Sequence, residues 1–338
     1  MERNLCLIGK GNVGTNFLRL LQKKQENLKA KFGLSFRIIA IFEYDGALIN
    51  HNGLDLPKIL ESSNNFRELK DWKKNIKALD YLSKLDIDIC IETTPTNPDT
   101  GEPALSHIIE SLKNGFDVVS SNKGPFYLKY RKIHELAKQN NCFVKYDATV
   151  ASCVPVLAIK SNLIANEIIG IKAILNGTSN YILSRMTSEG VNFSIALKEA
   201  QELGYAEADP TLDIEGFDAA GKLVILANEL FDLSLTIKDV KIKGISNITP
   251  QAIKLAKSDG YIIKHLAIYK NNSLLVEPRL IEKNSSLDIN GTLNAIEIQT
   301  KYAGPIILMG RGAGAQEAAA AILNDLINIQ QLRDFTKI

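Results

Sequence analysis

The first 21 residues carry the pattern that most restricts how this chain can fold. An apolar run at Asn4–Ile8 leads into the turn Gly-Lys-Gly-Asn-Val-Gly, after which Phe17, Leu18 and Leu21 recur at helical spacing. Strand, glycine turn and helix form the setting in which this motif binds a dinucleotide, because the glycines let a pyrophosphate approach the helix N-terminus. A chance glycine-rich turn is the alternative. The predicted binding residues are Gly9, Gly11, Asn12, Val13 and Gly14.

Strand-like and helical patterns alternate through the first 146 residues. Further strands are predicted at 36–42, 87–91, 117–119 and 142–146. Helices are predicted at 104–113 and 128–139. Alternation of this kind is typical of a parallel sheet covered by helices on both faces. We therefore expect an α/β fold that begins with a Rossmann-type, doubly wound domain.

An acidic residue follows the second predicted strand. Glu43 stands where a carboxylate accepts hydrogen bonds from the adenine ribose. It lies farther from Gly14 than the usual ~20 residues, which leaves Asp45 as an alternative. Both carboxylates would repel a 2′-phosphate and no arginine follows them directly, so the sequence favours NAD over NADP. Lys10 and Arg311 are the cations that could reach such a phosphate.

Polar side chains also follow two later strands. Thr93 and Thr94 come after one of them, and Ser120 and Lys123 after the next. Open parallel sheets bind ligands at the carboxyl ends of their strands, so these residues are expected at the cofactor. A lysine that directly follows a buried strand should extend its ammonium towards that site.

The pattern becomes less regular after residue 148. Strands are predicted at 168–175, 262–269, 274–280, 295–300 and 306–309. Helices are predicted at 155–163, 181–186, 195–203, 217–230 and 315–332. Several strands grouped with several helices indicate a second, α+β domain.

An acidic segment at residues 204–222 contains five carboxylates and ends in a lysine. Asp218 and Lys222 are four residues apart, so on a helix they share one face. The neighbouring positions are apolar or small, which predicts a helix buried on most sides. A charged pair on such a helix either is a structural ion pair or lines a pocket, because buried charge is costly unless it is paired.

Composition excludes several classes of protein. A chain of 338 residues suits two domains, and its net charge of +2 comes without a basic block, which argues against nucleic acid as a partner. We expect neither a signal peptide nor a membrane span. The four cysteines show no paired spacing and the four histidines are scattered, so we do not expect a zinc site. Unpaired cysteines indicate a reducing compartment, so we expect the protein in the cytoplasm.

Taken together, these motifs resemble the homoserine dehydrogenase family over essentially the whole chain. The matching segments, in the family's order, are 9–14, 120–125, 147–155, 175–181, 204–222 and 310–314 with the helix that follows. The resemblance implies NAD(P)-dependent, reversible reduction of L-aspartate 4-semialdehyde to L-homoserine, a step in threonine, methionine and isoleucine biosynthesis. It implies a dinucleotide domain at 1–148, a catalytic and dimerisation domain at 149–310, and a C-terminal helix, 311–338, that returns to the first domain.

The resemblance also assigns roles to single residues. Lys222 is similar to the family's proton donor with Asp218 beside it, and Lys123 to its second catalytic lysine. Gly314 is placed near the cofactor. Residues implied to bind the substrate are Glu207, which would hold the ammonium, and Asp213, Tyr205, Asn176, Gly177 and Thr178. An aldehyde that gains hydride develops alkoxide charge, which a nearby ammonium can stabilise and protonate.

The family further implies a monovalent cation, usually sodium, and a homodimer formed through the second domain's sheet. The cation positions here are Asp147, Val150, Ser152 and Val154. The chain reads Ala-Ser-Cys at 151–153, where the family more often has glycines, so the backbone angles are not guaranteed. Longer members carry a C-terminal regulatory domain of the ACT type. This chain ends at Ile338 without room for one, so strong feedback by threonine is not expected.

Two other readings stay open from the sequence. One is aspartate-semialdehyde dehydrogenase, which needs a nucleophilic cysteine; Cys153 is the candidate, but no histidine or cation lies near it in the sequence. The other is a non-catalytic regulator that binds a nicotinamide dinucleotide. That reading predicts loss of the lysines, whereas Lys123 and Lys222 are both present.

Overall fold

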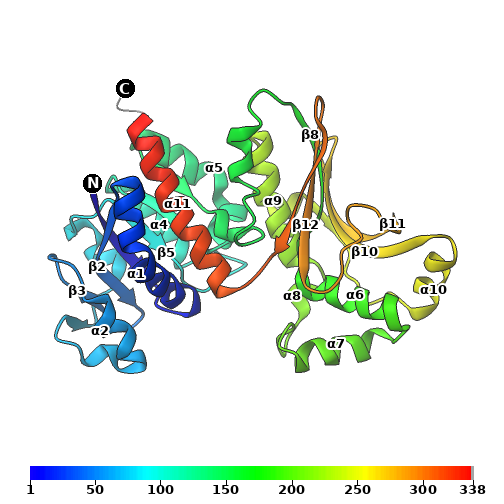
Figure 1. Cartoon of the computed structure of the whole chain (residues 1–338), viewed down its shortest axis with the longest axis horizontal. Helices are drawn as coiled ribbons and strands as arrows, with labels where there is room; N and C mark the ends of the chain where they lie inside the picture. The colour runs from blue at the N-terminus through cyan, green and yellow to red at the C-terminus, as the bar shows by residue number, and fades with distance from the viewer. Residues whose placement is uncertain (336–338) are drawn as a thin grey trace. The chain divides into compact units, whose positions relative to one another are not determined.

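The chain folds into two compact units. A computed structural model describes residues 1–335 (Figure 1). Unit 1 comprises Met1–Thr149 and the C-terminal segment that begins at Gly314, and unit 2 comprises Val150–Ala313. Unit 2 is therefore an insertion within the sequence of unit 1.

Unit 1 is built on a seven-stranded sheet in the order β4-β3-β2-β1-β5-β6-β7, as far as the described residues go. Five neighbouring strands, β2, β1, β5, β6 and β7, are parallel. Strands β3 and β4 extend the sheet beyond β2 as antiparallel neighbours. The chain changes direction across the sheet at β1 and β5, which is the switch point where such folds bind ligands. The strands are β1 (Glu2–Ile8), β2 (Ser35–Glu43), β3 (Gly46–Ile49), β4 (Trp72–Lys74), β5 (Ile89–Glu92), β6 (Asp117–Ser120) and β7 (Val144–Lys145).

Helices cover both faces of this sheet (Figure 1). In β1, Leu5 and Leu7 enter one core with residues of α1 and α11, whereas Cys6 and Ile8 enter the other. Burial on both faces explains why these strands are continuous apolar runs. The helices are α1 (Asn12–Phe32), α2 (Leu56–Glu61), α3 (Ala78–Tyr81), α4 (Ala104–Lys113), α5 (Gly124–Gln139) and α11 (Ala315–Phe335).

Unit 2 contains a six-stranded sheet in the order β13-β12-β8-β10-β11-β9, again counted over the described chain. All its pairs are antiparallel except β11 with β9. The strands are β8 (Ile168–Ile174), β9 (Val240–Ile242), β10 (Tyr261–Lys270), β11 (Ser273–Glu282), β12 (Leu293–Thr300) and β13 (Gly304–Arg311). The helices are α6 (Gly177–Glu189), α7 (Phe193–Glu202), α8 (Thr211–Ile214), α9 (Phe217–Phe231) and α10 (Pro250–Ser258).

The predicted α/β class and the predicted order of the main elements are confirmed, with one helix wrong. Residues 155–163 were predicted to be helical, but only a short 3₁₀ turn forms there, at Ala158–Asn162. None of the residues in that turn is buried, so the segment lacks the packed apolar face on which short helices depend. Within residues 1–335, no helix is both long and apolar enough to cross a bilayer.

Candidate active site

The glycine turn after β1 has the backbone geometry that its sequence predicted. Gly9 has a φ of +94°, and its N–H donates to the carbonyl of Phe42 at 2.9 Å. A Cβ at Gly14 would lie 2.2 Å from the carbonyl oxygen of Gly9, so only glycine lets α1 start this close to the strand. A Cβ at Gly11 would meet none of the described atoms within 4 Å. Space therefore remains open at the helix N-terminus, where backbone N–H groups attract anions.

A cavity of about 800 Å³ lies beside this turn, at the carboxyl ends of the unit 1 strands. The predicted cofactor residues that line it are Gly9, Gly11, Asn12, Val13, Glu43, Thr93 and Thr94. Sequence reasoning did not identify other residues of its wall, which include Tyr44, Leu79 and His107. Tyr44 is 86% exposed and Leu79 43% exposed, so each presents apolar surface to this cavity.

The carboxylates near the end of β2 are held differently from each other. Glu43 lines the cavity and accepts a hydrogen bond from the backbone N–H of Lys10 in the glycine turn. Asp45 instead makes a two-contact ion pair with Arg67, which follows it by 22 residues. No periodicity or motif around Arg67 signalled this pairing, because it depends on a 3₁₀ turn at Ser63–Glu68.

The loop after β5 is tied to the glycine turn and to the loop after β6. The hydroxyl of Thr93 donates to the carbonyl of Gly9 at 2.7 Å. The side-chain amide of Asn122 donates to the carbonyl of Thr94 at 2.9 Å. Ser120 is fully buried, and its hydroxyl accepts the N–H of Asn122. Lys123 is half-buried at the start of α5.

The pair predicted on the helix of residues 217–230 is present in unit 2. Lys222 Nζ lies 2.7 Å from Asp218 Oδ2, and it also donates to the carbonyl oxygen of Leu175 at 2.7 Å. The side chains of the lysine and the aspartate are 9% and 13% exposed. Residues Ala219–Asn228 are all buried, which confirms the prediction of a helix surrounded on most sides. The ammonium therefore has a fixed position in a largely dehydrated setting.

Asn176 organises the carboxylates around this pair. Its side-chain oxygen caps α6 by accepting the N–H of Ser179 at 2.8 Å. Its amide donates to Asp213 at 2.6 Å and to Asp218 at 2.9 Å, so one side chain bridges both acids. Burial and the nearby charge of Asp218 raise the pKa of Asp213, although hydrogen bonds from Asn176 and Thr178 oppose the rise.

Some of the other predicted substrate residues contact this cluster, and others do not. The hydroxyl of Thr178 donates to the carbonyl of Tyr205 at 2.7 Å and contacts Asp213 at 3.2 Å. A Cβ at Gly177 would lie 2.8 Å from the carbonyl of Thr292, so this position requires glycine. Glu207 is exposed, and within residues 1–335 no hydrogen bond or ion pair joins its carboxylate to the cluster.

The predicted cation loop contains an unusual backbone. Ala151 and Ser152 have φ values of +53° and +49°, a left-handed conformation that favours glycine. The N–H of Val154 donates back to the carbonyl of Ala151 at 3.0 Å, which closes a tight turn. The chain thus adopts at these two residues the angles that glycine would have permitted freely.

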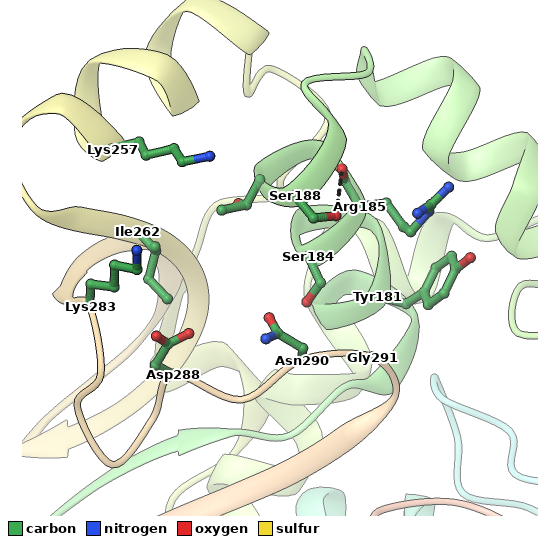
Figure 2. Close-up of a pocket in the computed structure, with 11 residues that line it drawn as sticks. Tyr181, Ser184, Arg185, Ser188, Lys257, Ile262, Lys283, Asp288, Asn290 and Gly291 are labelled. Atoms are coloured by element: carbon green, nitrogen blue, oxygen red, sulfur yellow. Dashed lines mark hydrogen bonds between the residues drawn. The ribbon is translucent and has the colours of Figure 1, made fainter.

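A smaller cavity of about 400 Å³ lies elsewhere in unit 2, between α6, α10 and the loop after β11 (Figure 2). Lys257, Lys283 and Asp288 face it, whereas the guanidinium of Arg185 turns away. Behind its wall, Lys264 is 2% exposed and hydrogen-bonds to Asn180 Oδ1 at 3.1 Å. Burial lowers the pKa of Lys264 to about 8. None of the predicted catalytic residues lines this cavity.

The sequence profile described as "Homoserine dehydrogenase" matches residues 155–327, and the profile described as "Homoserine dehydrogenase, NAD binding domain" matches residues 9–147. A homoserine dehydrogenase of Methanocaldococcus jannaschii is 43% identical over 330 residues, which are 96% of this chain and 98% of that protein. An NAD(+)-dependent homoserine dehydrogenase of Pseudomonas canavaninivorans is 36% identical, over 98% of this chain and 97% of that protein.

Solved structures agree with these matches. A crystal structure of a putative homoserine dehydrogenase from Archaeoglobus fulgidus superposes with a TM-score of 0.89 at 38% identity, covering 97% of this chain and 99% of that one. A hyperthermophilic archaeal homoserine dehydrogenase in complex with NADPH gives a TM-score of 0.85 at 26% identity, over 98% of both chains.

Proposed function

Because the chain belongs to the homoserine dehydrogenase family, an NAD(P)-dependent oxidoreductase family, we propose that its two units supply different parts of one reaction. Unit 1 provides the dinucleotide site and unit 2 the acid–base groups. The whole-length match supports neither a cysteine-dependent semialdehyde dehydrogenase nor a non-catalytic regulator. The observation that carries the proposal is the dehydrated Asp218–Lys222 pair within the acidic segment.

The residues of unit 1 fit a dinucleotide. Helix α1 begins at Asn12, and its N-cap residue, Gly11, provides no side-chain cap, so the N–H groups of the first turn suit a pyrophosphate. Glu43 would accept from the adenine ribose with the oxygen that Lys10 leaves available, and the exposed faces of Tyr44 and Leu79 would flank the adenine. Thr93, Thr94, Ser120 and Gly314 complete the predicted set.

Acid–base chemistry falls to Lys222. The bound cofactor supplies or accepts a hydride at the substrate's carbonyl carbon. Lys222 would stabilise the oxygen charge that develops on reduction and then give that oxygen a proton; on oxidation it would take the proton back. Asp218 and the carbonyl of Leu175 hold the ammonium in one orientation, so little reorganisation precedes the transfer. Lys123 would serve as a second cation at the reacting oxygen.

The substrate is a zwitterion and needs fixed charges of both signs. Glu207 would hold its ammonium, because this exposed carboxylate makes no competing side-chain contact within residues 1–335. Asp213, Asn176 and Thr178 already form one hydrogen-bonded group beside Lys222. Gly177 and Tyr205 border the same group, and together these residues would orient the substrate's carbonyl towards the ammonium.

A sodium ion would sit in the loop of residues 147–154. Two successive left-handed residues, Ala151 and Ser152, lie in this loop, and backbone strain of this kind tends to persist at functional sites. Asp147, Val150, Ser152 and Val154 would be the ligands. Its role would be structural, fixing the chain that links the two units.

We further propose a homodimer formed through the sheet of unit 2. β13 is an edge strand, and on one of its faces Ile307 and Met309 are 43% and 57% exposed. An edge strand with exposed apolar residues is a ready surface for a second copy. The free, buried thiols of Cys6, Cys90 and Cys142 support the cytoplasmic location expected from the sequence.

The deciding experiment is oxidation of L-homoserine, followed by absorbance at the band of the reduced cofactor. We expect turnover with NAD, and little with L-serine, whose hydroxyl carbon lies one methylene closer to the charged groups. Absence of turnover with either NAD or NADP, in protein shown to be folded and supplied with sodium, would refute the proposed function.

A further inference from the structure

Asp45 and Arg67 form an ion pair next to the cofactor cavity that no part of the proposed reaction uses. Arg67 Nε lies 2.8 Å from Asp45 Oδ2, and its Nη2 lies 3.1 Å from Oδ1, so the contact is the two-pronged kind that guanidinium makes with planar anions. The two side chains are 34% and 35% exposed. The hydrogen bond from Arg67 lowers the pKa of Asp45, so the aspartate stays charged at neutral pH.

Aromatic rings hold the guanidinium in place. Arg67 Cζ lies 4.6 Å from the ring centre of Phe66 and 5.6 Å from that of Trp72. The ammonium of Lys10 lies 4.3 Å from the ring centre of Phe66, so the two cations share this ring. Burial is the main cause that lowers the pKa of Lys10, Glu43 opposes it, and the charges of Arg19 and Arg67 add to the lowering, which places Arg67 within electrostatic range of Lys10.

Lys10 also locates this cluster relative to the adenine ribose. Its backbone N–H donates to Glu43, the carboxylate predicted to hold the ribose hydroxyls. NADP differs from NAD only by a phosphate on one of those hydroxyls. A phosphate at that position would therefore lie close to Lys10 and Arg67, and arginine is the side chain best suited to bind it with two parallel hydrogen bonds.

We propose that Arg67 is the receptor for the 2′-phosphate of NADP and that Asp45 competes with the phosphate for it, so that this ion pair sets the cofactor preference. With NAD the pair stays closed. With NADP, Arg67 leaves Asp45 for the phosphate, and Asp45 is left beside a dianion. This inference rests on the use of NAD(P) proposed above.

The size of each contribution gives the expected order of effects. An ion pair that is about a third exposed is a weak competitor, so removing the charge of Asp45 should favour NADP over NAD by about twofold to fivefold. An arginine–phosphate contact is a charge-assisted hydrogen bond and stronger, so removing Arg67 should disfavour NADP by at least about tenfold. Neither change removes a group that NAD would contact.

The test compares kcat/KM for NAD and NADP, with saturating L-homoserine, in four proteins: wild type, Asp45→Asn, Arg67→Gln and the double variant. We expect Asp45→Asn to raise the NADP/NAD ratio and Arg67→Gln to lower it, with the NAD value changed by less than about threefold. The double variant should have the same NADP/NAD ratio as Arg67→Gln, because without Arg67 the removal of the Asp45 charge frees no phosphate receptor. Glu135→Gln, which breaks the exposed Arg131–Glu135 pair on α5, is the matched control and should leave the ratio unchanged.

A binding measurement separates this inference from the activity itself. Adenosine 2′,5′-bisphosphate and AMP differ only by the 2′-phosphate, and both lack nicotinamide. Trp72, the only tryptophan in the sequence, packs beside Arg67, so its fluorescence should report the movement of the guanidinium. We expect the affinity for the bisphosphate, but not that for AMP, to fall at least about tenfold in Arg67→Gln.

Equal losses for both nucleotides, or an unchanged NADP/NAD ratio in Asp45→Asn, would overturn the inference. If no variant oxidised homoserine while the bisphosphate still bound through Arg67, the proposed function would fail and the phosphate site would stand.

Discussion

At the scale of single residues, the position of Lys222 is explained by its acceptors. A lysine with a 9% exposed side chain is costly unless its charge is paired, and Asp218 and the carbonyl of Leu175 both receive its N–H groups. A purely structural pair would also satisfy this requirement. The two interpretations differ in what they predict for turnover when the ammonium of Lys222 is removed.

Replacing Lys222 by Met keeps the aliphatic stem and removes the ammonium. Positioned general acids contribute about 10²–10⁴-fold, so kcat should fall at least roughly 10²-fold, whereas NAD affinity should change little. Steady-state kinetics and NAD titration measure the two effects. Lys198→Met, which removes an exposed lysine paired with Glu202 on α7, is the control and should keep wild-type kcat. A variant at Lys222 that folds normally and retains more than about a tenth of kcat would show that the pair is structural.

Lys264 gives a pH dependence whose sign follows from burial. Its pKa is about 8 in the folded protein, against about 10.4 in an unfolded chain. Between these values the unfolded chain holds the proton and the folded protein does not, so raising the pH favours the folded state. The free-energy penalty of burying the charged Lys264 is complete below pH 8, and it disappears above the pKa of the unfolded chain.

Urea unfolding of wild type and Lys264→Met at pH 7, 8 and 9.5 measures this penalty. Wild type should gain stability relative to the variant, by about 1 kcal/mol per pH unit above pH 8. The variant leaves Asn180 Oδ1 without its ammonium, but that cost does not depend on pH. A difference between the two proteins that stays flat over this range would mean that Lys264 titrates normally.

At the scale of elements, the sequence predicted most accurately where periodicity and chemistry coincide. The glycine turn with α1 and the buried helix α9 both combine a recognisable spacing with a reason for it. The 3₁₀ turn at 158–162 was predicted as helix because its composition is helical, while its lack of burial could not be read from one sequence. The antiparallel strands β3 and β4 are too short to leave a pattern.

The candidate site shows the same division. Residues within one motif, such as Asp218 and Lys222, were predicted together because helical spacing fixes their distance. Asn176 was expected only to line a pocket, and its bridge to Asp213 and Asp218 depends on how β8, α8 and α9 pack. Arg67 carried no signal at all, because a tertiary contact brings it to Asp45.

The left-handed turn at Ala151–Ser152 should be strained. The left-handed conformation costs a residue with a Cβ roughly 1–2 kcal/mol. Glycine avoids this cost, but it loses more conformational entropy on folding, which cancels part of the gain. Ala151→Gly should therefore raise the free energy of unfolding by about 0.5–1 kcal/mol in urea titrations. Ala158→Gly, in the neighbouring 3₁₀ turn with negative φ, is the control and should lower it. Destabilisation by Ala151→Gly would show that the turn is not strained.

At the scale of the whole molecule, α11 ties the end of the described chain to its beginning. Ile322, Leu326 and Ile329 are buried in the same core as Leu5 and Phe17. Leu326→Ala should cost about 2–5 kcal/mol and lower the urea midpoint of unit 1, which the fluorescence of Trp72 reports. Leu255→Ala, at a 65% exposed position on α10, should leave that midpoint unchanged. An unaltered Trp72 transition in Leu326→Ala would show that unit 1 does not depend on α11.

The division of the chain into units has a consequence for its synthesis. A ribosome makes the strands β1–β7, then all of unit 2, and only then α11. Domains generally fold as soon as their sequence has emerged, so unit 2 can fold while unit 1 still lacks one side of its core. During that interval the core that contains Leu5, Leu7 and Phe17 lacks its α11 residues, such as Ile322 and Leu326. The nascent chain therefore exposes the part of this core that α11 covers until α11 itself has been made, and this is the period in which a chaperone would be needed.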